Sequence, residues 1–331
     1  MLPLGSQLAK EERRVKITGI KTFLFNVATN QPPARDPGTG ELLSSDFKTW
    51  LFLKIETDVG ITGWGEGSGE WLSPIVETTL QLWEPLLVGR DPTSPAAICE
   101  DIQNRVSWKG GAVFGSAIAA IDAALFDITG KAWGVPVCKL LGGQRRDRIK
   151  VYDNGGLYFG SIDEARRIAR ESVADGFLGL KGNPLEERTW PMDGIALGHS
   201  SEVVHSVREE VGPEIELMLD CHGSPTPELA IAFAERTAAA RPLFIEEPCK
   251  AGSVDALAEI SRRSPIPIAT GEKLVTFRDF QEIIDRRACA FLQPDIGHSF
   301  GITNFVRSPD GLSPVPTHRR KLEGLVAQIT P

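Results

Sequence analysis

Hydrophobic positions in the first part of the chain, up to about residue 65, follow the pattern of β-strands. β-branched and aromatic residues dominate three short runs, at residues 15–27, 49–57 and 61–64. Gly60 lies in the turn between the second and third runs. Between the first two runs, residues 30–46 contain several prolines and glycines, which is typical of a long functional loop.

Helical spacing of apolar residues follows this strand region. Its clearest case places four residues on one helix face: Ile118, Ile121, Leu125 and Ile128. That helix should end near Gly130 or Gly134. We therefore predict an α+β domain over residues 1–140, built as a strand meander followed by helices.

After Gly142 and Gly143, short apolar strands alternate with helices. The expected strands are IKVY, FLGLK, IELMLD, LFIEE, IPIATGE and AFLQPD. Helix starts are expected at or near Ser161, Ser200, Thr226, Ser253 and Thr276. Six such units predict a parallel sheet of the (β/α)8 barrel type, which needs eight strands when complete. We expect an α/β region over residues 141–306 that forms an incomplete, TIM-like barrel.

Residues 307–331 break this pattern. They contain prolines, a basic cluster around His318 and one weak apolar run, so we expect a divergent and disordered tail. Our hypothesis is that the chain is a truncated or alternatively terminated form whose last strands are missing.

Composition narrows the classes of partner. The formal net charge is −8, which disfavours nucleic acid and acidic membrane surfaces. The most apolar stretch is interrupted by Asp122 and Asp127, so no membrane span is expected. Five scattered cysteines without a CxxC pair indicate reduced thiols and a cytoplasmic protein. A small-molecule partner is the remaining expectation; the sequence leaves a homo-oligomer open.

Three acidic residues end consecutive predicted strands. Asp220, Glu246 and Glu272 are spaced 26 residues apart, which is one βα unit each. In a barrel they would meet at the rim where active sites form. Neighbouring carboxylates repel one another, and oxygen ligands favour Mg²⁺, so we expect a magnesium site there.

Two other residues lie beside these acids. His222 follows Asp220 by two positions, so on an extended strand end both side chains would point the same way, and the histidine could act as an acid or base. Lys181 ends the second predicted strand and could be a base, a substrate contact or a partner of the carboxylates. Asn183 lies on the same side as Lys181.

The motifs MLDCHG, LFIEEP, ATGEKL and QPDIGHSFGIT, in this order and spacing, resemble the enolase superfamily. Within it they are similar to the mandelate racemase subgroup, and especially to its galactonate dehydratase-like acid-sugar dehydratases. GWGEGSGEW and AIAAIDAALFDITGKAWGVPVCKLLGG resemble the capping domain of that family and the segment leading into its barrel. The resemblance covers residues 15–303.

This resemblance implies Mg²⁺-dependent dehydration of a galactonate-like aldonate. A base would remove the proton α to the carboxylate, the metal would stabilise the enediolate, and a 2-keto-3-deoxy acid would result. Asp220, Glu246 and Glu272 would be the Mg²⁺ ligands, and His222, in a D-x-H motif, would be the acid that helps the hydroxyl to leave.

The resemblance also assigns three further positions. Lys181 and Asn183 match a K-x-N motif that contacts the substrate. Asp295 matches the aspartate that pairs with a base histidine one βα unit later, but no histidine occurs at that distance here.

The sequence therefore leaves two alternative functions open. One is a non-catalytic truncated member that retains the metal site. The other is a racemase or cycloisomerase of the same superfamily, which the D-x-H motif and the absence of a second lysine after Lys181 disfavour.

Overall fold

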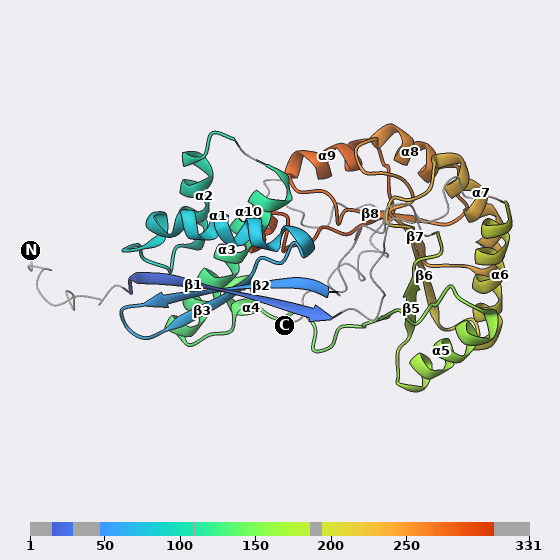
Figure 1. Ribbon diagram of the computed structural model, residues 1–331, viewed down its shortest axis with the longest axis horizontal. Helices are drawn as coiled ribbons and strands as arrows, with labels where there is room; N and C mark the ends of the chain where they lie inside the picture. The colour runs from blue at the N-terminus through green and yellow to red at the C-terminus, as the bar shows by residue number, and fades with distance from the viewer. Residues whose placement is uncertain (1–14, 29–46, 109, 186–193, 308–331) are drawn as a thin grey trace, which may run out of the picture. The chain divides into compact units, whose positions relative to one another are not determined.

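A computed structural model describes residues 15–28, 47–108, 110–185 and 194–307 (Figure 1). The predicted loop at 30–46 and the tail at 308–331, His318 included, therefore lie outside the described residues. The chain divides into two compact units, one of residues up to Gln144 together with the segment that starts at Ile296, and one of residues Arg145–Asp295.

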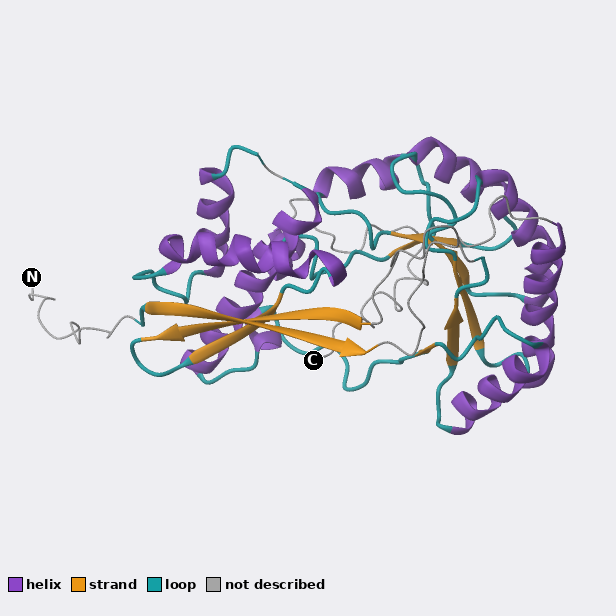
Figure 2. Cartoon of the chain, viewed as in Figure 1, coloured by secondary structure: helices purple, strands orange, loops and turns teal. Residues whose placement is uncertain are grey.

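The first unit is built on a three-stranded antiparallel sheet in the order β1-β2-β3 (Figure 2). Its strands are β1 (Ile17–Ala28), β2 (Phe47–Thr57) and β3 (Thr62–Glu66). Its helices are η1 (Glu70–Leu72), α1 (Ser73–Leu87), α2 (Pro95–Arg105), α3 (Gly111–Trp133), α4 (Val137–Leu140) and α10 (Gly301–Arg307). The predicted meander followed by helices is confirmed.

One face of this sheet forms the core of the unit. Alternate residues of the central strand, Leu51, Leu53 and Ile55, are fully buried. Helix α3 approaches β3 so closely that a Cβ atom added at Gly65 would lie 1.9 Å from the carbonyl oxygen of Ala120. Only glycine leaves room for this backbone contact.

Helix α3 confirms the predicted apolar face, since Ile118, Ile121, Leu125 and Ile128 are all 0% exposed. It ends where Gly134, at φ 68°, accommodates the left-handed cap. Within the described part of the chain, α3 alone has the length and hydropathy to cross a membrane, and 67% of its most apolar window is buried inside the protein.

Asp122, in the middle of α3, is fully buried and binds the segment that follows the last strand of the second unit. Its carboxylate accepts hydrogen bonds from the backbone N–H and the hydroxyl of Thr303, at 2.8 and 2.5 Å. Burial raises the pKa of Asp122, and the bonds from Thr303 oppose that rise. Ser116 and His298 add a second contact, 2.7 Å from Oγ to Nδ1. The structure thus groups residues 296–307 with the first unit, whereas the sequence placed them in the barrel.

Among the described residues, the second unit contains a parallel sheet in the order β4-β5-β6-β7-β8-β9, and the six parallel strands expected for the barrel are confirmed. The strands are β4 (Asp153–Asn154), β5 (Gly179–Gly182), β6 (Glu216–Asp220), β7 (Phe244–Glu246), β8 (Ile268–Thr270) and β9 (Phe291–Leu292). The helices are α5 (Ile162–Ala174), α6 (Gly194–Val211), α7 (Pro227–Thr237), η2 (Ala238–Ala240), α8 (Val254–Arg263) and α9 (Phe277–Asp285). Helices α5 to α9 form an arc around the strands (Figure 1).

Most predicted boundaries in this unit are confirmed by capping. Ser161, Thr226, Ser253 and Thr276 each accept a backbone N–H as N-caps. Two predictions were wrong. The IKVY run is not a strand, because Ile149 and Val151 are 42% and 53% exposed and pairing begins only at Asp153. The helix expected near Ser200 begins at Gly194.

The close approach of α3 to β3 can be tested by Gly65→Ala. The added methyl group would overlap the Ala120 carbonyl, so we expect a loss of about 3 kcal/mol in the free energy of unfolding, measured by urea denaturation. Gly198→Ala, in helix α6, is the matched control, because a Cβ atom there meets nothing within 4 Å. It should be neutral or stabilising by up to about 1 kcal/mol. Equal effects of the two substitutions would contradict the packing described.

Candidate active site

Three charged side chains meet at the C-terminal ends of β5, β6 and β7. The Lys181 ammonium lies 2.9 Å from Oδ2 of Asp220 and 2.8 Å from Oε2 of Glu246. The parallel register that pairs Asp220 with Glu246 brings the two carboxylates side by side. All three side chains are at most 6% exposed, so one buried ammonium group faces two buried carboxyl groups.

The pKa values of this group follow from burial and from the neighbouring charges. Burial alone would lower the pKa of Lys181, but Glu246 and Asp220 raise it, so the ammonium stays protonated. Burial raises the pKa of Glu246 to about 7; the charge of Asp220 adds to this rise, and Lys181 opposes it. Burial also tends to raise the pKa of Asp220, but its bond from His222 and the charge of Lys181 bring it below its usual value.

His222 reaches Asp220 through a turn and not through the extended strand end that the sequence predicted. Strand β6 ends at Asp220, and His222 adopts a left-handed backbone conformation with φ 50°. Its backbone N–H donates to Oδ1 of Asp220 at 3.2 Å, and its Nε2 lies 3.0 Å from Oδ2. The bond to Asp220 raises the pKa of the imidazole. Cys221 between them is fully buried.

Asn183 connects β5 to this histidine. Its Nδ2 lies 3.2 Å from Nδ1 of His222, while its Oδ1 accepts the backbone N–H of Leu185 at 3.2 Å. Both nitrogens of the imidazole therefore have a partner, Asp220 on one side and Asn183 on the other.

Glu272 and Asp295 lie beyond their strands, nearer the loops. Glu272 follows the end of β8 by two residues, and its side chain is 38% exposed. Burial of the carboxyl group and the charge of Asp220 raise its pKa. Asp295 lies in the loop three residues past β9, whereas the sequence placed it at the end of the strand.

No group of three or more His, Cys, Asp or Glu side chains in the described ranges converges closely enough to hold a metal ion. The Lys181 ammonium bridges two of the three expected ligands, Asp220 and Glu246. The donor chemistry nevertheless fits a hard divalent cation, because Asp220 raises the pKa of both Glu246 and Glu272 by repulsion that such a cation would relieve. The ligand set stays a prediction.

Two residues that the sequence analysis missed make hydrogen bonds beside the site. One of them, Glu247, directly follows Glu246 at the end of β7. Its carboxylate is 2% exposed and accepts the hydroxyl of Thr270 at 2.7 Å and the N–H of Gly271 at 2.9 Å. Lys273 donates to the carbonyl of His222 at 2.6 Å and lies 3.8 Å from Glu247. The second acid of LFIEEP and the lysine after Glu272 were the available signals.

Gln293, just after β9, is a third residue that the sequence analysis missed. Its Nε2 makes a long contact of 3.4 Å with Glu246, and its Oε1 is buried without a hydrogen-bond partner among the described residues.

Two other histidines bond to the backbone of the second unit. His199 and His205 each bond to a backbone carbonyl, of Gly160 and Arg236, at 2.9 Å.

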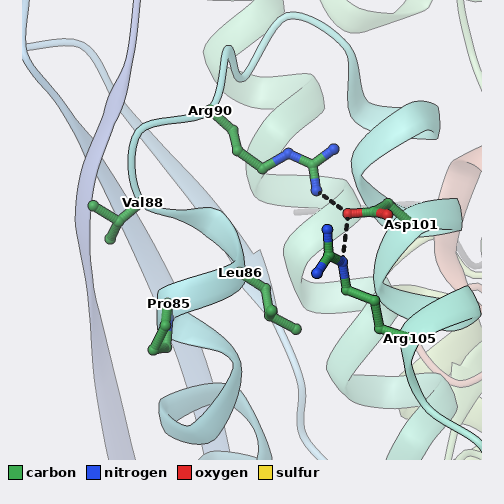
Figure 3. A pocket seen from close by; sticks show the side chains of 6 residues that line it. All are labelled: Pro85, Leu86, Val88, Arg90, Asp101 and Arg105. Atoms are coloured by element: carbon green, nitrogen blue, oxygen red, sulfur yellow. Dashed lines mark hydrogen bonds and ion pairs between the residues drawn. The ribbon is translucent and has the colours of Figure 1, made fainter.

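A separate surface hollow of about 490 Å³ lies in the first unit, where Arg90 and Arg105 both point at Asp101 (Figure 3). It contains none of the candidate residues.

Two family models match the chain. The mandelate racemase / muconate lactonizing enzyme N-terminal domain matches residues 23–142, and the enolase C-terminal domain-like model matches residues 164–309. A protein named D-galactonate dehydratase from Verminephrobacter eiseniae is 35% identical over 260 residues, which cover 78% of this chain and 67% of that protein. The chain belongs to the enolase superfamily.

Further relatives agree with this membership. A protein named D-galactonate dehydratase from Ralstonia pickettii is also 35% identical, over 78% of this chain and 67% of its own length. The structure of a candidate dehydratase from Mesorhizobium loti is 33% identical, with a TM-score of 0.77 over 87% of this chain and 74% of that one. A candidate galactarate dehydratase from Agrobacterium radiobacter, solved with Na and L-malate, is 28% identical, with a TM-score of 0.74 over 87% and 69%.

This membership confirms the resemblance that was inferred from the sequence. It also confirms the predicted fold, a capping domain with a barrel. The relatives are named dehydratases, which are hydro-lyases, and the enolase-superfamily chain described here is accordingly a lyase. Dehydratases of the superfamily generally use Mg²⁺. These findings do not test the roles of individual residues.

The role of Lys181 can be tested by Lys181→Met. Removing the ammonium leaves two buried carboxylates without a cation, so we expect the free energy of unfolding to fall by about 3 kcal/mol without metal, and millimolar Mg²⁺ to restore part of the loss. Thermal melts with and without Mg²⁺ measure both effects. Lys131→Met is the control, since Lys131 is 45% exposed and pairs with Asp127 at the surface. A variant as stable as the parent would show that the Lys181 ammonium does not stabilise the two carboxylates.

The support of His222 by Lys273 can be tested by Lys273→Met. Without the bond to its carbonyl, the left-handed turn should relax and the imidazole should leave Asp220. The ¹⁵N chemical shifts of the ring nitrogens report this, and the signals of His222 are those lost in His222→Asn. Lys273→Arg, which keeps a donor, should preserve them. Unchanged ring signals in the methionine variant would show that Lys273 does not position the histidine.

Proposed function

We propose that this enolase-superfamily lyase carries out Mg²⁺-dependent dehydration of an acid sugar, a galactonate-like aldonate, to a 2-keto-3-deoxy acid. The observation that carries the proposal is the buried cluster at the strand ends, in which His222 bonds to Asp220 and Lys181 lies between Asp220 and Glu246. The names of the relatives, D-galactonate dehydratase, support the substrate class. We place the enzyme in the cytoplasm, with a small molecule as its substrate.

His222 is the proposed acid. Its bond to Asp220 raises the pKa of the imidazole, so a larger fraction is protonated near neutral pH than for a free histidine. The side chain is 52% exposed, so a substrate can approach it while Asp220 and Asn183 orient the ring. A proton can then pass to the departing β-hydroxyl, which leaves as water.

The remaining residues would bind and orient the substrate. Asp220, Glu246 and Glu272 are the proposed Mg²⁺ ligands, and the metal would offset the negative charge that develops on the substrate carboxylate when the α-proton leaves. Lys181 and Asn183 are the proposed substrate contacts. Asp295 is the proposed partner of a base histidine.

A second function follows from one observation about the base. Of the other described histidines, His199 and His205 bond to backbone carbonyls and His298 bonds to Ser116, and the sequence has no histidine one βα unit after Asp295. A non-catalytic member of the family that binds Mg²⁺ without turnover is therefore the alternative.

Turnover and metal binding separate the two functions. We expect the purified chain to form a keto acid from an aldonate in a panel of sugar acids, and His222→Asn and Glu246→Gln to lower kcat/KM at least about a hundredfold. Millimolar Mg²⁺ should raise the melting temperature of the parent and of His222→Asn, but not of Glu246→Gln.

Each result has a distinct meaning. An Mg²⁺-dependent rise in the melting temperature without turnover on any sugar acid would support the non-catalytic alternative. If the chain shows no turnover and its melting temperature does not respond to Mg²⁺, both functions are overturned. His199→Asn, outside the cluster, should leave all measurements unchanged.

A further inference from the structure

Glu247 lies between the two loops that carry His222 and Glu272. Strand β7 ends at Glu246, and Glu247 follows it with a left-handed backbone conformation at φ 43°. A residue other than glycine keeps this conformation only where surrounding contacts fix it, and such positions cluster at functional sites. The bonds that fix Glu247 therefore indicate what this turn supports.

The backbone of Glu247 bonds to both neighbouring segments. Its carbonyl oxygen accepts the N–H of Gly223 at 2.7 Å, in the loop after β6, and its own N–H donates to the carbonyl of Ala269, on β8, at 3.0 Å. Gly223 directly follows His222 in the chain. The first of these bonds thus ends one residue from the proposed acid.

The side chain of Glu247 holds the loop after β8. One carboxylate oxygen, Oε1, accepts both the hydroxyl of Thr270 and the N–H of Gly271, and Gly271 directly precedes Glu272. Hydrogen bonds to a carboxylate are stronger than those between neutral groups, and removal of a buried acceptor leaves its donors unpaired. The carboxylate thus fixes the backbone one residue from a proposed metal ligand.

Lys273 links the two loops through the same carboxylate. Its ammonium donates to the carbonyl of His222 at 2.6 Å, and it lies 3.8 Å from Oε2 of Glu247 and 3.6 Å from Oε1 of Glu272. Without the Glu247 carboxylate, Glu272 would be the remaining ion-pair partner of Lys273 among the described residues. We expect the ammonium to move towards Glu272 in that case, and away from His222.

The partners of Glu247 share one property. Among the described residues, each of its hydrogen-bond and ion-pair partners lies within three residues of His222 or Glu272 in the chain. We propose that Glu247 is a positioning residue, which fixes the proposed acid, His222, relative to the proposed metal ligand, Glu272. This inference rests on the proposed function and extends it to a residue that acts through its neighbours.

Glu247→Ala and Glu247→Gln, made in the full chain, test this role. The alanine variant loses the carboxylate, so the ring ¹⁵N signals of His222 should shift, and the Kd for Mg²⁺ from isothermal titration calorimetry should rise at least about tenfold. The glutamine variant keeps an acceptor oxygen for Thr270 and Gly271. Its His222 signals should therefore match those of the parent, and its Kd for Mg²⁺ should stay within about threefold.

Thr270→Val provides a second variant should Glu247→Ala fail to fold, which circular dichroism would show. It removes one bond to Glu247 and leaves the charge, so the His222 signals should move in the same direction and by less. Two controls separate position from stability. Glu259→Ala removes an acid that is 51% exposed on helix α8, and Thr237→Val removes a hydroxyl that is buried in helix α7. Both should leave the His222 signals unchanged.

Three results would be decisive. Unchanged His222 signals, or an unchanged Kd for Mg²⁺, in Glu247→Ala would overturn the proposal. Equal changes in the alanine and glutamine variants would overturn it as well, because the effect would then follow the loss of charge and not the loss of the bonds. A parent chain that neither binds Mg²⁺ nor dehydrates a sugar acid would overturn the proposed function, while the His222 signals would still decide the role of Glu247.

Discussion

A single buried ammonium group organises the candidate site. Parallel strands place their C-terminal residues side by side, so two adjacent strands that both end in an acid bring two carboxylates out of water together. Such a pair is unfavourable unless a cation lies within bonding distance. Lys181 supplies one, 2.9 and 2.8 Å from Asp220 and Glu246, and the arrangement of His222 and Asn183 above it depends on Asp220 staying ionised.

One positive charge for two negative ones leaves the cluster electrostatically incomplete. Burial and the charge of Asp220 raise the pKa of Glu246 to about 7, far from that of a solvated carboxyl group. A cation that binds such a site relieves the repulsion between its carboxylates. The same repulsion that favours metal binding therefore destabilises the site when it is empty. The left-handed conformation of His222, at φ 50°, is a further local cost, which the bond from Lys273 to its carbonyl helps to offset.

The sequence could predict what depends on local pattern. The strands that end at Asp220 and Glu246 and the caps at Thr226 and Ser253 follow from periodicity and hydrogen-bonding capacity. The turn at His222 could not be predicted. An extended strand end would also bring His222 next to Asp220, so the spacing of the two residues does not distinguish the two geometries. Asp122 interrupts an apolar run in the sequence, and its actual role depends on Thr303, 181 positions away.

That last contact has a consequence for how the chain acquires its structure. Because residues 296–307 belong to the first unit, that unit is discontinuous, and residues 145–295 of the second unit lie between its parts. During synthesis, Asp122 leaves the ribosome long before Thr303, and until then the helix contains a carboxylate that must stay hydrated or protonated. The first unit can therefore be completed only after residues 145–295 of the second unit have been made.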